Sequence, residues 1–229
     1  MPAPAIDWES LILSIKLASI SSALLLIICI PGAWFIQALP RKAKAPIEAI
    51  STLPMVLPPT VLGFYLLVFL GPHGWIGQFW QNFSDTKLVF SFSGLVIGSM
   101  VYSLPFVLQP ILNAYNNISP AAIQLASSLG ASPLDRFFTV IIPHSKRGII
   151  SAAVLGFAHT LGEFGVVLLI GGNISGETRV VSIAIYDHVE ALEYSSAHQL
   201  SGILLLISFI ILIILSFFNS KKGGYSWLR

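Results

Sequence analysis

The sequence predicts an all-α integral membrane protein, a bundle of about five transmembrane helices, with six as the alternative count. Hydrophobic residues make up 55% of the 229 residues and charged residues only 10%, and the mean hydropathy is +0.83. A soluble domain carries about 25% charged residues, so this chain has too little charge to cover a water-exposed surface. The apolar and polar alternation typical of barrel strands is absent, which favours helical spans.

Five apolar stretches are long enough to cross about 30 Å of hydrocarbon, which takes about 20 helical residues. They are residues 11–38, 49–71, 88–113, 148–172 and 199–219. Several of them contain prolines, namely Pro31, Pro54, Pro58, Pro59 and Pro105. Each proline frees backbone carbonyls that need partners, which favours a packed bundle around a pathway. Gly94 and Gly98 predict close helix packing, and residues 1–229 are expected to form one membrane domain.

The distribution of cations predicts the orientation. Nine of the twelve Lys and Arg residues fall on one side of the five-span arrangement: Arg41, Lys42, Lys44, Arg136, Lys146, Arg147, Lys221, Lys222 and Arg229. That side is expected to be cytoplasmic, which puts the N-terminus outside and the C-terminus inside. Residues 1–10 lack a basic n-region, so the first span is expected to be retained. Cys29 is the only cysteine, which excludes an internal disulfide.

Residues 119–147 predict a cytoplasmic loop of two short amphipathic helices. Ser119 and Ser132 each precede a proline and are expected to be N-caps, and Asp135 would complete a capping box. Gly130 is expected to end the first helix in the left-handed conformation, and Pro143 to end the second. The two helices carry apolar stripes at helical spacing: Ala122, Leu125, Ala126 and Leu129, then Leu134, Phe137, Phe138 and Ile141.

This loop resembles the cytoplasmic loop of bacterial ABC importer permeases, which carries Glu-Ala-Ala, three residues, Gly, nine residues and Ile-x-Leu-Pro. Here the same spacing joins Gln124-Leu125-Ala126, Gly130 and Val140-Ile141-Ile142-Pro143. Further stretches resemble the molybdate permeases, so that the similarity spans roughly residues 10–218. They are Leu53-Pro54, Leu57-Pro58-Pro59, Leu161 to Gly165, Gly172 to Arg179 and Ala184-Ile185-Tyr186.

The resemblance implies a permease subunit of the bacterial inner membrane that forms a homodimer. Two ATP-binding cassette subunits would bind ATP and Mg on the cytoplasmic side, and an oxyanion-binding protein would dock outside. The ATPase-docking residues would be Gln124, Ala126, Gly130, Leu134, Phe137, Phe138, Val140 and Pro143. The phosphate-binding motif GxxxxGK[ST] is absent. The chain is therefore expected to be no enzyme and to hold no cofactor, and no nucleic-acid partner is expected.

Glu163 is the one acidic residue inside a predicted span. A carboxylate at membrane depth costs about 2.5–3.5 kcal/mol, so it should face the bundle interior, a cavity or a partner. Two interpretations remain open: a pathway or gate residue, or a cap for amides near Gly162 and Gly165. Hydroxyls such as Thr160 and Ser151 suit brief contact with a tetrahedral dianion.

Neither a metal site nor a catalytic group is expected. His159 lies four residues before Glu163 on the same helix face, but spacing suggests no third ligand. The polar segment 173–179 is expected at the outer mouth, and 180–192 along the membrane interface. Tungstate or sulfate import is the close alternative to molybdate import. An autonomous channel or an intramembrane enzyme is the distant one.

Overall fold

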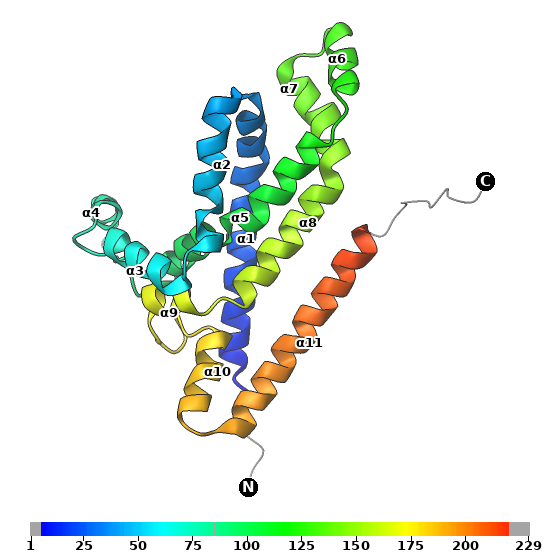
Figure 1. The fold of residues 1–229 in the computed structure, drawn as a ribbon. Coiled ribbons are helices and arrows are strands. Elements are labelled where there is room, and N and C mark those ends of the chain that lie inside the picture. Colours follow the sequence, from blue (N-terminus) through cyan, green and yellow to red (C-terminus); the bar gives the residue numbers. More distant parts are fainter. Residues whose placement is uncertain (1–5, 85, 220–229) are drawn as a thin grey trace.

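The computed structural model describes residues 6–84 and 86–219, and every regular element in these two ranges is helical. This confirms the predicted all-α class (Figure 1). The elements, one of them a π-helical turn labelled η1, are α1 Trp8–Ala38, α2 Arg41–Val56, α3 Pro59–Leu70, α4 Trp75–Gln81, α5 Phe92–Asn116, α6 Pro120–Ser128, α7 Pro133–Arg136, η1 Phe137–Ile141, α8 Ile142–Leu161, α9 Gly165–Gly171, α10 Val181–Glu190 and α11 Tyr194–Asn219.

The five predicted spans correspond to three long helices and two bent pairs. In the described part of the chain, α1, α5 and α11 are each long and apolar enough to cross a membrane. The second span is broken between α2 and α3, which diverge by 112°, because consecutive prolines at 58 and 59 cannot continue a helix. The fourth is broken between α8 and α9, at 62°. The second span is therefore not a straight helix, and α2 begins at Arg41, well before residue 49.

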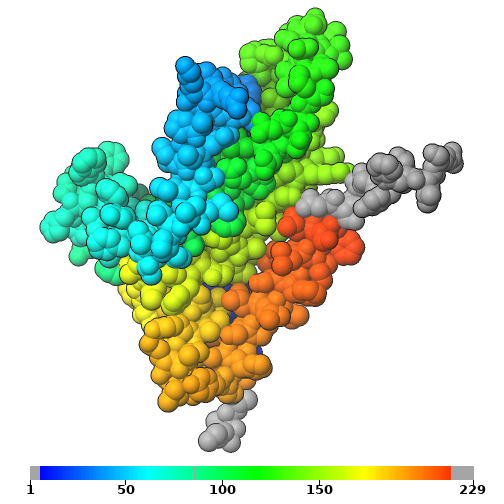
Figure 2. Space-filling view, viewed as in Figure 1, coloured from blue at the N-terminus to red at the C-terminus, as the bar shows by residue number. Residues whose placement is uncertain are grey.

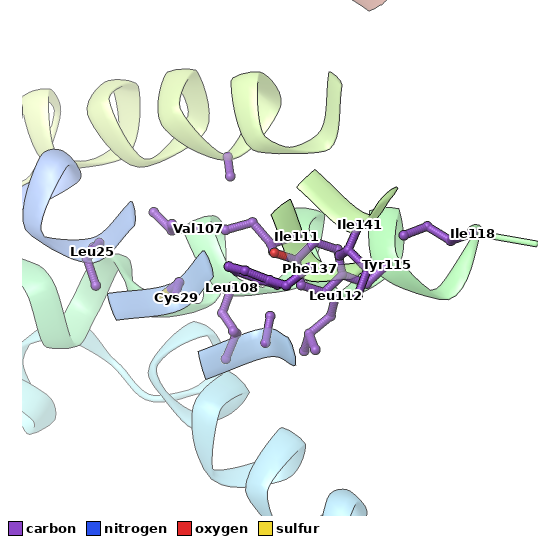
Figure 3. Packing of buried hydrophobic residues seen from close by; sticks show 12 residues of the cluster. Leu25, Cys29, Val107, Leu108, Ile111, Leu112, Tyr115, Ile118, Phe137 and Ile141 are labelled. Carbon is purple, nitrogen blue, oxygen red and sulfur yellow. The ribbon is translucent and has the colours of Figure 1, made fainter. Parts of the chain in front are cut away.

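Helices α1, α5 and α8 pack against one another and form the centre of the bundle. Figure 3 shows the buried cluster at one end of this centre, where Leu25 and Cys29 of α1 lie among Val107, Ile111 and other side chains. The predicted close packing at Gly98 is confirmed, since a Cβ there would lie 2.4 Å from Ile170 of α9. Small residues thus let these elements approach closely.

Helix α11 lies along one side of the molecule, where it contacts α8 and α10 (Figures 1 and 2). Only 6% of its most apolar window is buried within the chain. Leu205, Phe209 and Phe217 are among its exposed side chains. Lipid or another protein must therefore cover most of this helix.

The connection between α1 and α2 lies at the same end of the molecule as α6 and α7 (Figure 1). The start of α1 lies near α10 at the opposite end. Arg41 and Arg136 therefore share one end, as the cation pattern predicts. Three cations counted in that pattern, Lys221, Lys222 and Arg229, lie outside the described residues, as do residues 1–5.

Candidate functional site

The two-helix loop of residues 119–147 has the predicted turn and one of the two predicted caps. Gly130 adopts φ +83°, the left-handed conformation that ends α6. Ser132 and Asp135 form the capping box: the Asp135 amide donates to Ser132 Oγ at 3.1 Å, and the Ser132 amide donates to Asp135 Oδ2 at 3.1 Å. Hydrogen bonds from the Ser132 side chain and backbone lower the pKa of Asp135. Ser119 occupies the N-cap of α6, but its side chain makes no capping hydrogen bond.

Pro143 does not end the second helix, contrary to the prediction. The chain continues from α7 through the π-helical turn η1 into α8, where Pro143 lies in the first turn. In η1 the Ile142 amide donates to the Phe137 carbonyl, five residues back. The wider π turn accommodates the proline that an α-helix would exclude, since such bulges relieve a local conflict with the i to i−4 ladder.

The exposed face of the loop is apolar. Leu129 is 80% exposed and Phe138 59% exposed, and Leu125 and Leu134 are exposed as well. Among the other predicted docking residues, Gln124 and Pro143 are exposed, whereas Ala126 and Val140 are half-buried. Neighbouring large apolar side chains in an otherwise polar loop are typical of a protein interaction surface.

Phe137 is buried although its ring contacts that of the exposed Phe138 at a centroid distance of 5.1 Å, which corrects its predicted place in the docking set. It is only 6% exposed, and its ring packs on Trp34 of α1 at a centroid distance of 4.8 Å. Figure 3 shows Phe137 among Ile111, Tyr115 and Ile141. Phe137 therefore fixes the loop to the bundle and is not available for docking.

Glu163 lies in the break between α8 and α9 and is only 4% exposed. Neither carboxylate oxygen has a hydrogen-bond partner in residues 6–84 and 86–219. The Ser99 hydroxyl is a polar neighbour, but the pair does not meet hydrogen-bond geometry. No described amide donates to the carboxylate, and the N-cap of α9 is Phe164, which makes no side-chain capping hydrogen bond. These contacts contradict the helix-cap interpretation and leave the carboxylate facing a cavity.

That cavity measures about 540 Å³ and lies where α3 begins and α8 ends. Thr60, Tyr102, His159 and Glu163 are its polar lining residues. The backbone at Glu163, on one side of the cavity, is held in place because Ser182 Oγ of α10 donates a hydrogen bond to the Glu163 carbonyl at 2.5 Å. The break between α8 and α9 and the break at Pro58 and Pro59 therefore border the same cavity.

The hydroxyls predicted to contact a substrate do not line this cavity. Thr160 is buried, and its Oγ1 lies 2.8 Å from Ser103 Oγ. Ser103 Oγ also lies 2.9 Å from His159 Nδ1, while the His159 ring stacks on Phe106. Ser151 is half-buried on α8, outside the cavity lining. The structure therefore brings Glu163 together with His159, and it separates both from Ser151.

Sequence reasoning missed Thr60 and Tyr102 as members of this site. Thr60 precedes Glu163 by about a hundred residues and Tyr102 by about sixty. Neither belongs to a local pattern that points to Glu163. Only the packing of α3 and α5 against α9 brings them together.

A polar cluster joins the segment 173–179 to α10, at the end opposite the two-helix loop of residues 119–147, called the coupling loop from here on. Asn173 Nδ2 donates to both carboxylate oxygens of Asp187, at 2.9 and 2.8 Å, and Arg179 Nε lies 3.2 Å from Asp187 Oδ2. Helix α10 buries Val181, Ile183 and Ala184 against the rest of the chain. Tyr186 and Val189 of α10 are exposed, and the expected position of this helix along the membrane interface stays a prediction.

The chain is similar to known transport proteins over nearly its whole length. The family described as "Binding-protein-dependent transport system inner membrane component" matches residues 13–222. The molybdenum transport system permease protein ModB of Azotobacter vinelandii is 50% identical over 226 residues, which cover 99% of this chain and 100% of that protein. The sulfate transport system permease protein CysT of Salmonella typhimurium is 29% identical, over 83% of this chain and 69% of that protein.

Solved structures share the fold. A bacterial alginate ABC transporter, crystallised in complex with its alginate pentasaccharide-bound periplasmic protein, matches with a TM-score of 0.75. The match covers 95% of this chain and 79% of that chain, at 17% sequence identity.

Proposed function

Because the chain belongs to the family of binding-protein-dependent transport system inner membrane components, we propose that it is the permease subunit of an ATP-driven molybdate importer. The observation that carries this proposal is the 50% identity to a molybdenum permease along that protein's entire length. The chain is a multi-pass protein of the bacterial inner membrane.

Sulfate import is the closest alternative, since a sulfate permease is also a relative. That relative is less similar, and this chain spans only 69% of it, whereas it spans the whole of the molybdenum permease. Tungstate has the same tetrahedral shape and charge as molybdate, so the permease would pass both. The choice between them would then depend on the binding protein.

The exposed apolar face of the coupling loop supports docking of an ATP-binding subunit. Leu125, Leu129, Leu134 and Phe138 offer the apolar anchors that a helix-in-groove contact uses. A homodimer would present two such loops, one for each ATP-binding subunit. The loop shares its end of the molecule with Arg41 and Arg136, so this end is assigned to the cytoplasm and the opposite end to the binding protein.

The cavity at Glu163 supports a gating role for this carboxylate. When Glu163 is ionised, its carboxylate lacks a counter-charge and would repel a tetrahedral dianion, so Glu163 would control passage and not hold the substrate. Its position at two helix breaks fits a gate, because broken helices in transporters typically lie beside the substrate pathway.

The test is transport by the complete complex in proteoliposomes, reconstituted with its ATP-binding subunits and binding protein. We expect uptake of radiolabelled molybdate that requires ATP, is reduced by tungstate and resists excess sulfate. Equal uptake of sulfate would favour the alternative substrate. Uptake without nucleotide would favour a channel and contradict the proposal.

A further inference from the structure

A second cavity, of about 520 Å³, lies at the end of the molecule that carries the coupling loop. It lies between the end of α1, the end of α5 and the helical elements α6, α7 and η1 of the loop. Pockets for small molecules typically measure about 300–1,000 Å³. Most of its lining is apolar or aromatic: Trp34, Phe35, Tyr115, Ile118, Ile123 and Ile141.

Arg136 is the only charged residue among the ten that line this cavity. Its Nη1 donates to Ser127 Oγ at 3.3 Å, whereas its Nε is buried and has no partner in the described parts of the chain. The adjacent Asp135 carboxylate already accepts hydrogen bonds from Ser132. No carboxylate pairs with the guanidinium among the described residues, so its charge is uncompensated, which fits a phosphate group.

The cavity lies at the C-terminal end of the apolar helix α1. Phe35 is 64% exposed and would face acyl chains, and Trp34 belongs to the class of side chains enriched at membrane interfaces. Arg41 and Lys42 follow shortly after Ala38, and both are exposed. Apolar side chains therefore come first and cations follow. This is the order of the acyl chain and the headgroup in a phospholipid.

From this arrangement we infer that the cavity binds an anionic phospholipid of the cytoplasmic leaflet. The acyl chain lies against Trp34 and Ile123, and the headgroup phosphate accepts hydrogen bonds from Arg136. Basic pockets beside transmembrane helices on the cytoplasmic side suit such headgroups. The inference depends on the membrane location of the chain and not on which anion it transports.

The experiment compares lipid binding by the purified complex and its variants, measured by native mass spectrometry. We expect phosphatidylglycerol to bind in preference to phosphatidylcholine, and Arg136→Gln to weaken binding about fivefold, the loss typical of one interfacial cation. Ala38 is an exposed residue of the cavity lining. Ala38→Trp should fill part of the cavity without changing any charge, and it should therefore abolish lipid binding. Arg147→Gln removes an exposed cation at the same end and should leave binding unchanged.

Three results would overturn the inference. One is equal retention of phosphatidylglycerol by the wild type, Arg136→Gln and Ala38→Trp. Another is displacement of the lipid by excess glycerol phosphate, which would show that the acyl chain contributes nothing. The third is binding to the isolated permease that disappears when the ATP-binding subunits are present, which would assign the cavity to that protein.

Discussion

At the scale of single residues, Glu163 departs most from ordinary membrane chemistry. Its carboxylate is buried, lacks a hydrogen-bond partner among the described residues and lines a cavity. A buried hydrogen-bond acceptor without a donor lowers the stability of the fold. A role in the substrate pathway therefore explains the presence of Glu163 better than a structural role.

We expect Glu163→Gln to fold normally and to change transport or its coupling to ATP hydrolysis, because it removes the ionisable carboxyl group and keeps the shape. Glu163→Leu should likewise assemble, since the carboxylate accepts no hydrogen bond that folding needs. Uptake and ATPase assays, with thermal unfolding of both variants, provide the measurement. The control is Glu48→Gln, an acid at the surface of α2. Wild-type uptake in both Glu163 variants would remove this residue from the gate.

The capping box predicts a pH effect at Asp135. Its pKa is lowered by Ser132, so the carboxylate stabilises α7 above the ordinary aspartate pKa, and this stabilisation disappears as the pH falls through the lowered value. Ser132→Ala should raise the pKa of Asp135 towards its ordinary value, which a carboxyl NMR titration measures. Ser128→Ala, at an exposed serine of α6, should leave this pKa unchanged. No shift in Ser132→Ala would contradict the role of the capping box.

At the scale of elements, the coupling loop has an exposed face, which we propose binds the ATP-binding subunit, and a face buried in the bundle. Phe138 points outwards, whereas Phe137 packs on Trp34 in the core. Two adjacent phenylalanines should therefore respond differently to the same substitution.

Phe138→Ala should weaken association with the ATP-binding subunit by about 2 kcal/mol, as truncation of an interface anchor commonly does. Phe137→Ala should instead destabilise the permease by about 3–5 kcal/mol, because it opens a cavity in the core. Copurification of the ATP-binding subunit and thermal unfolding separate the two effects. Equal losses of association in the two variants at equal stability would contradict this division of faces.

Gly130→Val tests the turn between α6 and α7. A residue with a Cβ at φ +83° costs about 1–2 kcal/mol, so α6 should lose its defined end and coupled ATP hydrolysis should fall. Gly202→Val is the matched control, since Gly202 lies in helix α11 and a Cβ there meets nothing within 4 Å. Equal ATPase activity in both variants would show that the turn is not required.

At the scale of the whole molecule, orientation is the property to test. In a Cys29→Ser background, cysteines introduced at Ser175 and Ser132 should react with an impermeant reagent from opposite sides of intact cells. Both native serines are exposed, and they lie towards opposite ends of the bundle. Labelling of both from outside would contradict the five-span arrangement.

The spans, the Gly130 turn and the capping box could be predicted from the sequence because each depends on neighbouring residues. The apolar stripe could not separate Phe137 from Phe138, since the spacing assigns both to one face and only the packing on Trp34 distinguishes them. The sequence predicts a helix end at Pro143 because a π turn leaves no composition signal. Thr60 and Tyr102 join Glu163 through tertiary contacts alone.

The continuous helix from Pro133 to Leu161 links the coupling loop directly to the break that precedes Glu163. At 1.5 Å per residue it is about 42 Å long. Along this length α8 packs against α1 and α5, so it cannot tilt on its own. A displacement imposed on the exposed face of the loop would therefore reach the cavity as a joint movement of three packed helices, and not as the swing of one helix.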